Sequence, residues 1–591
     1  ELKRNKVTND LQVLRRQAAA ISFIRGIRKL DGTRLFLGHV GCGTGDGWGS
    51  FDYLNHLPLQ EWEDYVVQWS RHGVQPIGST EHGHPYPMSF VNHGVPDGDS
   101  EPWHTEYCAA LLGETAYRLE RPEFRKLIRD IYDPVSGTFR AGAIHGHSAV
   151  AYTHREPAVQ EYWAIHDRNI YRSWRLYGVN MGIEPFGEPH NYIREKVLNA
   201  PHRQVIATGR EFLKQTGAFP DRFLQNDYFR KEAIPAFPEQ PTGLKPAILT
   251  PLGESLYANN HEFLGFVADR SDRPTAKTHI YAPGETVEKN LALIWDGLKP
   301  AEVTISGEIR LSGKVLEKIR RTVRLTPGEI RLSSFRFAIP ADAGGTLAEP
   351  AGGSISVQFD CNGRESTDEF PFSVVAPPKA LSRRVALFDP AGTAGAMKEF
   401  AAQTVTKPEE LKALDAELVM IAPEALTPGI ERLLPKRIPV LVLPQKSATL
   451  ERLGFRTDPI RSRRLFPDCS LAVAPELLRD WRAGTTFSTF SETAPWRPGH
   501  NNYIGSTGMV AGTVIEVPHF GNYTPLTHGE FDLSRTALLA TEVNQAPWLF
   551  CQLELPANAA IDPAARALAV KLLDEFGKKP VSRQPVRLLG T

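Results

Sequence analysis

The first third of the chain alternates between two hydrophobic patterns. Apolar residues recur every three or four positions in several segments, which predicts amphipathic helices over residues 5–29, 59–72, 105–121 and 159–177. Short apolar runs between them predict strands over residues 34–39, 51–57, 74–80 and 178–183. This alternation predicts a parallel sheet with helical crossovers. The C-terminal ends of the predicted strands are rich in polar residues, as in a (β/α)8 barrel, where these ends carry the chemistry. A Rossmann-like sheet is the alternative, but no GxGxxG loop follows a strand here.

From about residue 240 the pattern changes to period two. Runs such as residues 301–311 and 354–360 alternate apolar and polar side chains between Gly and Pro turns. This spacing predicts an antiparallel, Ig-like β-sandwich over residues 241–376. Residues 201–240 are expected to connect it to the preceding domain.

A proline-containing linker at residues 376–379 precedes a third pattern. Apolar strands separated by helical segments predict a small doubly wound, flavodoxin-like α/β domain over residues 380–480. These strands are residues 383–390, 417–423 and 438–444. Residues 481–591 are expected to form a β-rich C-terminal domain with a terminal helix. The predicted fold is a multidomain α/β and β chain, because 591 residues exceed a single core.

The composition narrows the class of protein. Lys+Arg and Asp+Glu both number 68, and zero net charge argues against a nucleic-acid binder. No run of about 18 apolar residues occurs, so no membrane span is expected. Five cysteines without CxxC spacing exclude a zinc ribbon. The His-x-His pairs at residues 82–84 and 145–147 have no third ligand, so neither a metal nor a cofactor is expected.

Histidine and tryptophan are concentrated in one part of the chain. Twelve of the 18 histidines and six of the 10 tryptophans fall within residues 1–190. Imidazole and indole rings are common where proteins bind polar ligands with apolar faces, such as sugars. A histidine-rich surface is the alternative interpretation.

Two motifs in this part resemble a known family. Residues 29–34 (KLDGTR) and 75–83 (QPIGSTEHG) resemble the second half of the catalytic barrel of glycoside hydrolase family 2 and its relatives. Gly32 stands where that family often has proline, and residues 178–188 lack the tryptophan that often closes its eighth strand. The resemblance implies that residues 1–200 are the C-terminal half of a (β/α)8 barrel. Residues 534–555 also resemble the ends of large multidomain relatives.

The resemblance implies a retaining glycosidase in which Glu81 is the nucleophile. A loop-capping role for Glu81 is the alternative. A retaining mechanism needs a second carboxyl group about 5–5.5 Å away. The family's acid/base belongs to an Asn-Glu pair, which this chain lacks. We therefore expect the acid/base upstream of residue 1, with Glu184 or Glu188 as the alternative.

A half barrel would expose an unpaired strand edge at residues 34–39. We therefore expect the missing half to come from an upstream segment or a second chain, and a homo-oligomer remains open. No nucleic-acid or membrane partner is expected. A periplasmic or secreted location is favoured over a cytoplasmic one.

Further substrate contacts are expected around Glu81. The candidates are His39, Asp52, Tyr53, His82, Trp103, His104, Trp163 and Glu184. Tyr53 could donate a hydrogen bond to Glu81 or be a half-buried core residue. Trp103 and Trp163 could form a sugar-stacking wall or belong to a core or interface.

The sequence thus leaves two functions open. The first is a retaining glycoside hydrolase acting on β-linked carbohydrate, and the second is a non-catalytic carbohydrate-binding or assembly protein on the same scaffold. The patterns do not identify the glycoside.

Overall fold

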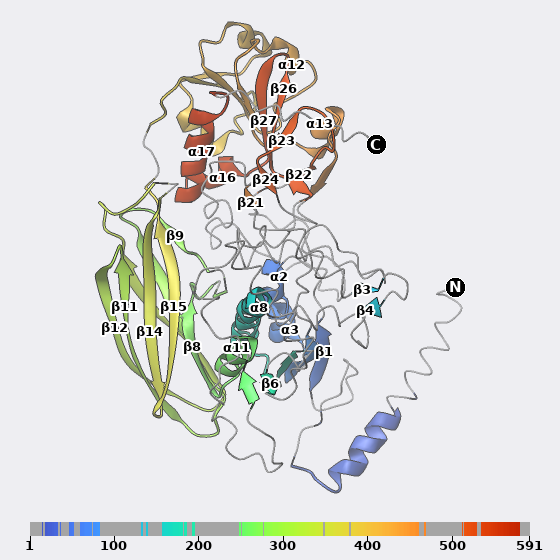
Figure 1. The fold of residues 1–591 in the computed structure, drawn as a ribbon, viewed down its shortest axis with the longest axis vertical. Helices are drawn as coiled ribbons and strands as arrows, with labels where there is room; N and C mark the ends of the chain where they lie inside the picture. The colour runs from blue at the N-terminus through green and yellow to red at the C-terminus, as the bar shows by residue number, and fades with distance from the viewer. Residues whose placement is uncertain are drawn as a thin grey trace. The chain divides into compact units, whose positions relative to one another are not determined.

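The structure is a computed structural model, and it describes residues 15, 18–33, 36, 47–52, 59–73, 75–82, 132–133, 138–139, 157–180, 182–185, 192–194, 247–249, 251–272, 274–275, 277–346, 349–376, 380–459, 466–467, 511, 513–528 and 534–578. The chain divides into two compact units. One is formed mainly by residues up to Leu264, and the other mainly by residues from Gly265 onward. Figure 1 shows the elements of both, coloured along the chain.

The first unit contains a three-stranded parallel sheet. Its strands, in spatial order, are β1 (Trp48–Asp52), β2 (Ile77–His82) and β5 (Ile183–Pro185). Helices occupy both connections: α2 (Leu59–Asp64) and α3 (Val67–His72) between β1 and β2, and α8 (Pro157–Leu176) between β2 and β5. The described strands therefore pair in parallel, as the alternation of helix and strand predicts.

Buried tryptophans hold the helices of this unit together. Trp62, Trp163 and Trp174 are each 1% exposed. The indole Nε1 of Trp174 donates to the Trp62 carbonyl at 2.8 Å, which joins α8 to α2. A further helix, α11 (Pro251–Asn259), packs along α8, where the Ser255 hydroxyl donates to a backbone carbonyl at 2.7 Å. Burying one large apolar side chain contributes about 1.5–3 kcal/mol to folding. The three tryptophans therefore stabilise the packing of α8 in this unit.

Several elements of the first unit differ from their predictions. Strand β1 begins at Trp48 and not at residue 51, and β2 covers Ile77–His82 and not residues 74–80. The helix expected over residues 59–72 is divided into α2 and α3. The strand expected over residues 178–183 begins only at Ile183, the first residue of β5. Gly178 and Gly182 have φ values of 88° and 113°, which an extended strand does not accommodate. Hydrophobicity alone does not reveal such backbone angles.

Other predictions for this part are only partly covered. Residues 18–28 are helical, within the helix expected over residues 5–29, and Phe23 there is 68% exposed. The helix expected over residues 105–121, and the strand over residues 34–39 apart from residue 36, lie outside the described residues. Four short strands form two ribbons: β3 (Tyr132–Asp133) with β4 (Thr138–Phe139), and β6 (Tyr192–Arg194) with β7 (Ala247–Leu249).

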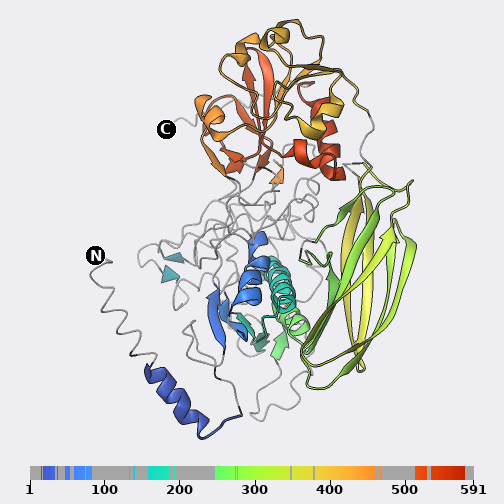
Figure 2. The same ribbon diagram turned by 180° about the vertical axis from the view of Figure 1, so that it is seen from behind.

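Residues 263–374 form two β-sheets that face each other, and Figure 2 shows them as two layers. One sheet has the order β13 (Glu329–Ala338), β10 (Thr286–Trp295), β8 (Phe263–Ala268). The other has the order β12 (Lys314–Leu325), β11 (Ala301–Leu311), β14 (Ala351–Cys361), β15 (Arg364–Val374), β9 (Ile280–Tyr281). Rings of Phe337 and Phe372 meet between the sheets at 5.7 Å.

Turn chemistry fixes the long hairpins of the second sheet. Ser312-Gly313 joins β11 to β12, and Asn362-Gly363 joins β14 to β15. All four residues have positive φ, between 47° and 85°. Two consecutive positive φ values define the two-residue turn whose twist matches that of paired strands. Burial alternates along β11, so one face of this sheet lies in the core, as the period-two pattern predicts.

Residues 380–578 form a seven-stranded sheet with short helices. Its order is β17 (Gln403–Val405), β16 (Val385–Phe388), β18 (Leu418–Ile421), β19 (Val440–Val442), β27 (Ala546–Cys551), β26 (Leu538–Val543), β23 (Tyr523–Pro525). The first five strands are parallel, and the last two are antiparallel additions. Strands β16, β18 and β19 are buried along their whole length, which suits a sheet covered on both faces.

This sheet contains strands from both sides of the boundary predicted at residue 480. Strands β26 and β27, assigned from the sequence to a separate β-rich domain, extend the sheet that contains β16, β18 and β19. The parallel pair β19–β27 joins segments about a hundred residues apart, a distance that local patterns do not reveal. The expected helices between the strands are largely short 3₁₀ segments, η2 (Gly395–Phe400) and η3 (Pro408–Ala413).

The remaining elements are short, apart from the C-terminal helix. They are α12 (Ile430–Leu433), α13 (Ser447–Arg452), β20 (Thr457–Pro459), β21 (Phe466–Pro467), β22 (Thr513–Glu516), β24 (Thr527–His528), β25 (Arg535–Thr536), α16 (Leu555–Asn558) and α17 (Pro563–Glu575). Among the described helices, none combines the length and apolar character that a membrane crossing requires.

Candidate functional site

Strand β2 carries Glu81 as its penultimate residue. On one side β1 pairs Ser50 with Ser79 and Phe51 with Glu81, so Thr80 is skipped and the register shifts by one residue. An extra residue of this kind bends a strand and re-aims its side chains. Such irregularities are common beside active sites.

The same irregularity is present on the other side of β2. Ser79 pairs with Ile183 of β5, and His82 pairs with Pro185. Three steps along β2 therefore match two steps along β5. Both neighbouring strands thus place the extra residue between Ser79 and His82, immediately around Glu81.

Candidate carboxylate residues lie on all three strands. Asp52 is the last residue of β1 and the register partner of His82, while Glu184 is the middle residue of β5. Because the strands are parallel, their carboxyl ends meet at one edge of the sheet. Adjacent strands lie about 4.8 Å apart. Residues 52, 81 and 184 are therefore on neighbouring strands near that edge.

His82 has an interior side chain, 1% exposed, beside helix α8. Its Nε2 lies 3.5 Å from Oδ1 of Asp167, and Nδ1 of His166 lies 3.1 Å from the same oxygen. Asp167 is 0% exposed. Since His166 and Asp167 belong to α8, the network joins the end of β2 to the helix.

Aromatic rings enclose this network. The ring centroid of His82 lies 6.2 Å from that of Tyr171 and 6.0 Å from that of Trp174. The ring of His166 meets Trp62 edge-on at 4.6 Å. The Tyr171 hydroxyl donates to a carbonyl of β5 at 2.5 Å. A carboxylate withdrawn from water among such rings needs polar partners. The imidazole of His166 is within hydrogen-bonding distance of Asp167, and that of His82 lies at the longer distance of 3.5 Å.

Two of the predicted substrate contacts have buried side chains. His82, at the end of β2, and Trp163, on α8, are each 1% exposed. Trp163 lies on the inward face of α8, which fits the core alternative. The remaining candidates lie outside the described residues: His39, Tyr53, His84, Trp103, His104, His145, His147 and Glu188.

Sequence reasoning missed the pair His166 and Asp167. A signal was present, because Trp163, Asp167, Ile170 and Trp174 follow the three- and four-residue spacing of a buried helix face. An acidic residue within such an apolar stripe is rarely buried without a partner. Its partner, however, comes from a strand 85 residues earlier, which local spacing does not indicate.

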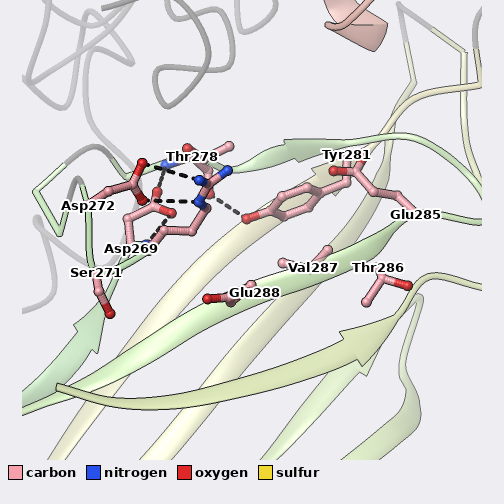
Figure 3. Close-up of a pocket in the computed structure, with 10 residues that line it drawn as sticks. Asp269, Ser271, Asp272, Thr278, Tyr281, Glu285, Thr286, Val287 and Glu288 are labelled. Carbon is pink, nitrogen blue, oxygen red and sulfur yellow. Dashed lines mark hydrogen bonds and ion pairs between the residues drawn. The ribbon is translucent and has the colours of Figure 1, made fainter. Parts of the chain in front are cut away.

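A separate polar pocket of about 580 Å³ lies on the sandwich (Figure 3). Its carboxylates already have partners within that domain. Asp272 pairs with Arg270 at 3.1 Å, and Glu288 pairs with Arg336 at 2.7 Å. Glu285 accepts a backbone N–H at 2.9 Å. The arrangement is that of a structural network. Within the described ranges, no group of three His, Cys, Asp or Glu residues could hold a metal ion.

A buried ion pair lies at the edge of this pocket. The Lys289 ammonium donates to Oδ2 of Asp269 at 2.9 Å and to the Thr278 carbonyl at 2.5 Å. Figure 3 shows Asp269 and Thr278 side by side. Burial lowers the pKa of Lys289 to about 8, although the Asp269 carboxylate opposes this shift.

Comparisons with known proteins give distant neighbours only. No family model and no curated protein matches the chain. The sporulation control protein Spo0M from Bacillus subtilis is 17% identical over 20% of this chain and 50% of that chain, with a TM-score of 0.15. A β-glucuronidase from Bacteroides uniformis is 11% identical over 30% of this chain and 22% of that one, with a TM-score of 0.16.

A family 123 glycoside hydrolase from Clostridium perfringens is 10% identical, over 27% of this chain and 38% of that chain, with a TM-score of 0.15. Glycoside hydrolases are thus among the distant structural neighbours. The chain spans half or less of each of these three structures.

Proposed function

We propose that the protein is a glycoside hydrolase that cleaves β-linked carbohydrate with retention of configuration, and that Glu81 is its nucleophile. The observation that supports this most directly is the place of Glu81 in the sheet. It is the penultimate residue of β2, at a register irregularity shared with β1 and β5. In barrels and open sheets of parallel strands, reacting groups gather at the carboxyl ends of the strands.

The proposed chemistry has two displacement steps. The Glu81 carboxylate attacks the anomeric carbon, the bond to the leaving group breaks, and an acid protonates the departing oxygen. Water then attacks the same carbon, gives its proton to the acid/base residue and releases Glu81 as a carboxylate. Each step inverts the anomeric carbon, so the product retains its configuration.

We assign the acid/base to a segment outside residues 1–591, together with the remaining strands of a (β/α)8 barrel. Glu184 is the alternative within the chain. It lies on β5, which is adjacent to β2. The spacing of neighbouring strands, about 4.8 Å, is close to the separation of about 5–5.5 Å between the two carboxyl groups of retaining enzymes.

The second candidate function is carbohydrate binding without catalysis on the same scaffold. It would be the function of this scaffold if no acid/base residue partnered Glu81. Binding and hydrolysis differ in one measurable respect, because only a hydrolase releases product, and that turnover should be lost when the charge of Glu81 is removed.

The first test is hydrolysis of a panel of aryl β-glycosides by the full gene product. Glu81→Gln preserves size but removes the charge, so kcat should fall at least about 10³-fold, or about 4 kcal/mol in barrier, while binding persists. Glu302→Gln, which changes an exposed glutamate on β11, is the matched control and should leave kcat unchanged. Binding of glycosides without hydrolysis by the unaltered protein would favour the second candidate.

A further inference from the structure

The buried network of His82, Asp167 and His166 has no part in the proposed bond-breaking steps. Each of the three side chains is at most 1% exposed. Replacing buried charged and polar groups with well-packed apolar side chains is often neutral or stabilising, so stability alone is a weak reason for the network. Its location is more informative, because His82 directly follows Glu81 on β2.

The network attaches a rigid support to one point of β2. Asp167 lies midway along the 20-residue helix α8, and the Trp174–Trp62 hydrogen bond holds that helix to α2. Arg175 adds hydrogen bonds to two carbonyls, those of Asn259 at the end of α11 and His261 just beyond it. The 3.5 Å contact between His82 and Asp167 therefore joins β2 to an element that is itself fixed.

The attachment lies where β2 is least regular. Neither β1 nor β5 keeps its register with β2 between Ser79 and His82. An irregular strand end is set less firmly by its ladder than a regular one. A side-chain anchor at His82 supplies the constraint that the ladder lacks.

We propose that His82 is a positioning residue for Glu81, held by Asp167 so that the preceding residue meets the anomeric carbon in a fixed orientation. This inference rests on the proposed function. Misplacing a reacting group by about 1 Å can cost about 10²-fold in rate. Loss of the anchor should therefore lower kcat by about 10- to 100-fold and leave KM nearly unchanged.

The chain offers a matched control for this test. His166 contacts the same oxygen of Asp167 and is equally buried, but it belongs to α8 and not to β2. His82→Leu should slow covalent labelling by a 2-deoxy-2-fluoro aryl glycoside, which reports the first displacement alone. His166→Leu should alter that rate less than about threefold. Equal slowing by both variants would overturn the inference.

Two further variants separate positioning from folding. His82→Gln retains an amide donor for Asp167 and should recover part of the labelling rate. His82→Leu combined with Asp167→Leu removes the buried charge, so thermal stability should recover while kcat stays low. Recovery of kcat together with stability would show a purely structural role and overturn the proposal.

The two hypotheses fail in distinguishable ways. An active Glu81→Gln variant would contradict the proposed function and this inference with it. An inactive Glu81→Gln variant beside a His82→Leu variant of unaltered kcat would contradict the positioning role alone.

Discussion

Lys289 is a fully buried cation within the sandwich. Its ammonium contacts the Asp269 carboxylate and lies 4.3 Å from the ring centroid of Phe370. Burial lowers its pKa from 10.5 to about 8, because an ammonium loses its hydration there. The pair fastens the loop after β8 to β10, since the same carboxylate also accepts the backbone N–H of Thr278 at 2.5 Å.

The lowered pKa of Lys289 predicts how stability depends on pH. Between about pH 8 and 10.5 the unfolded chain holds a proton that the folded chain has released. This group alone should therefore raise the free energy of unfolding as pH increases through that window, by up to about 3 kcal/mol. Denaturant unfolding at pH 7.5, 8.5 and 9.5 measures this rise in the free energy of unfolding.

The control is the paired variant Lys289→Met with Asp269→Asn, which removes both charges. Its unfolding free energy should lack the rise that Lys289 contributes. A pH dependence identical to that of the unaltered protein would contradict the assignment.

At the residue scale, the sequence indicated where some candidate residues lie along the strands but not which side chains they contact. The strand predicted over residues 74–80 ends one residue before Glu81, and in the structure this strand, β2, continues through Glu81 to His82. The Asp167 contact of His82 and the Asp269 contact of Lys289 were not predictable. Each joins residues about 20 or more positions apart, and no local spacing encodes such a pairing.

Among the elements, α17 shows how one side chain can define a helix end. Asp562 precedes Pro563 and accepts the backbone N–H groups of Ala564 at 2.8 Å and Ala565 at 3.0 Å. Its side chain is 1% exposed, so water does not replace these bonds when they are lost.

Asp562→Ala should lower the free energy of unfolding of this domain by about 1–2 kcal/mol, because two buried donors lose their acceptor. Asp562→Asn keeps a carbonyl oxygen at the same place and should lose less. Thermal or denaturant unfolding of both variants measures the two losses in the free energy of unfolding. Equal losses would assign the effect to charge and not to capping.

Element prediction succeeded where pattern and turn chemistry agree. The period-two run over residues 301–311 became β11, and its Ser-Gly turn matches the twist of the hairpin. Element prediction failed where a residue has a backbone angle that a strand does not allow. The positive φ of Gly182 delays the start of β5 to the next residue. The division of the helix over residues 59–72 likewise has no counterpart in its hydrophobic spacing.

On the scale of the whole molecule, the sheet of residues 380–578 combines distant segments. Val440, Leu441 and Val442 of β19 are each 0% exposed and pair with Trp548, Leu549 and Phe550 of β27. Removing β27 would leave β19 as an apolar edge strand, which is prone to aggregate. The sequence predicted the parallel strands but not the strand that completes them.

A fragment of residues 380–480 should therefore fail to fold, whereas residues 380–591 should unfold cooperatively. Circular dichroism during denaturant unfolding, with light scattering for aggregation, compares the two. A stable, monomeric 380–480 fragment would restore the boundary predicted from the sequence.

The most direct test of the central claim is covalent capture of the nucleophile. The full gene product is incubated with a 2-deoxy-2-fluoro β-glycoside that it turns over, digested and examined by mass spectrometry. Our account predicts the glycosyl adduct on the peptide that contains Glu81, and no adduct in Glu81→Gln. An adduct on the peptide containing Glu184, or inversion of the product's anomeric configuration, would contradict it.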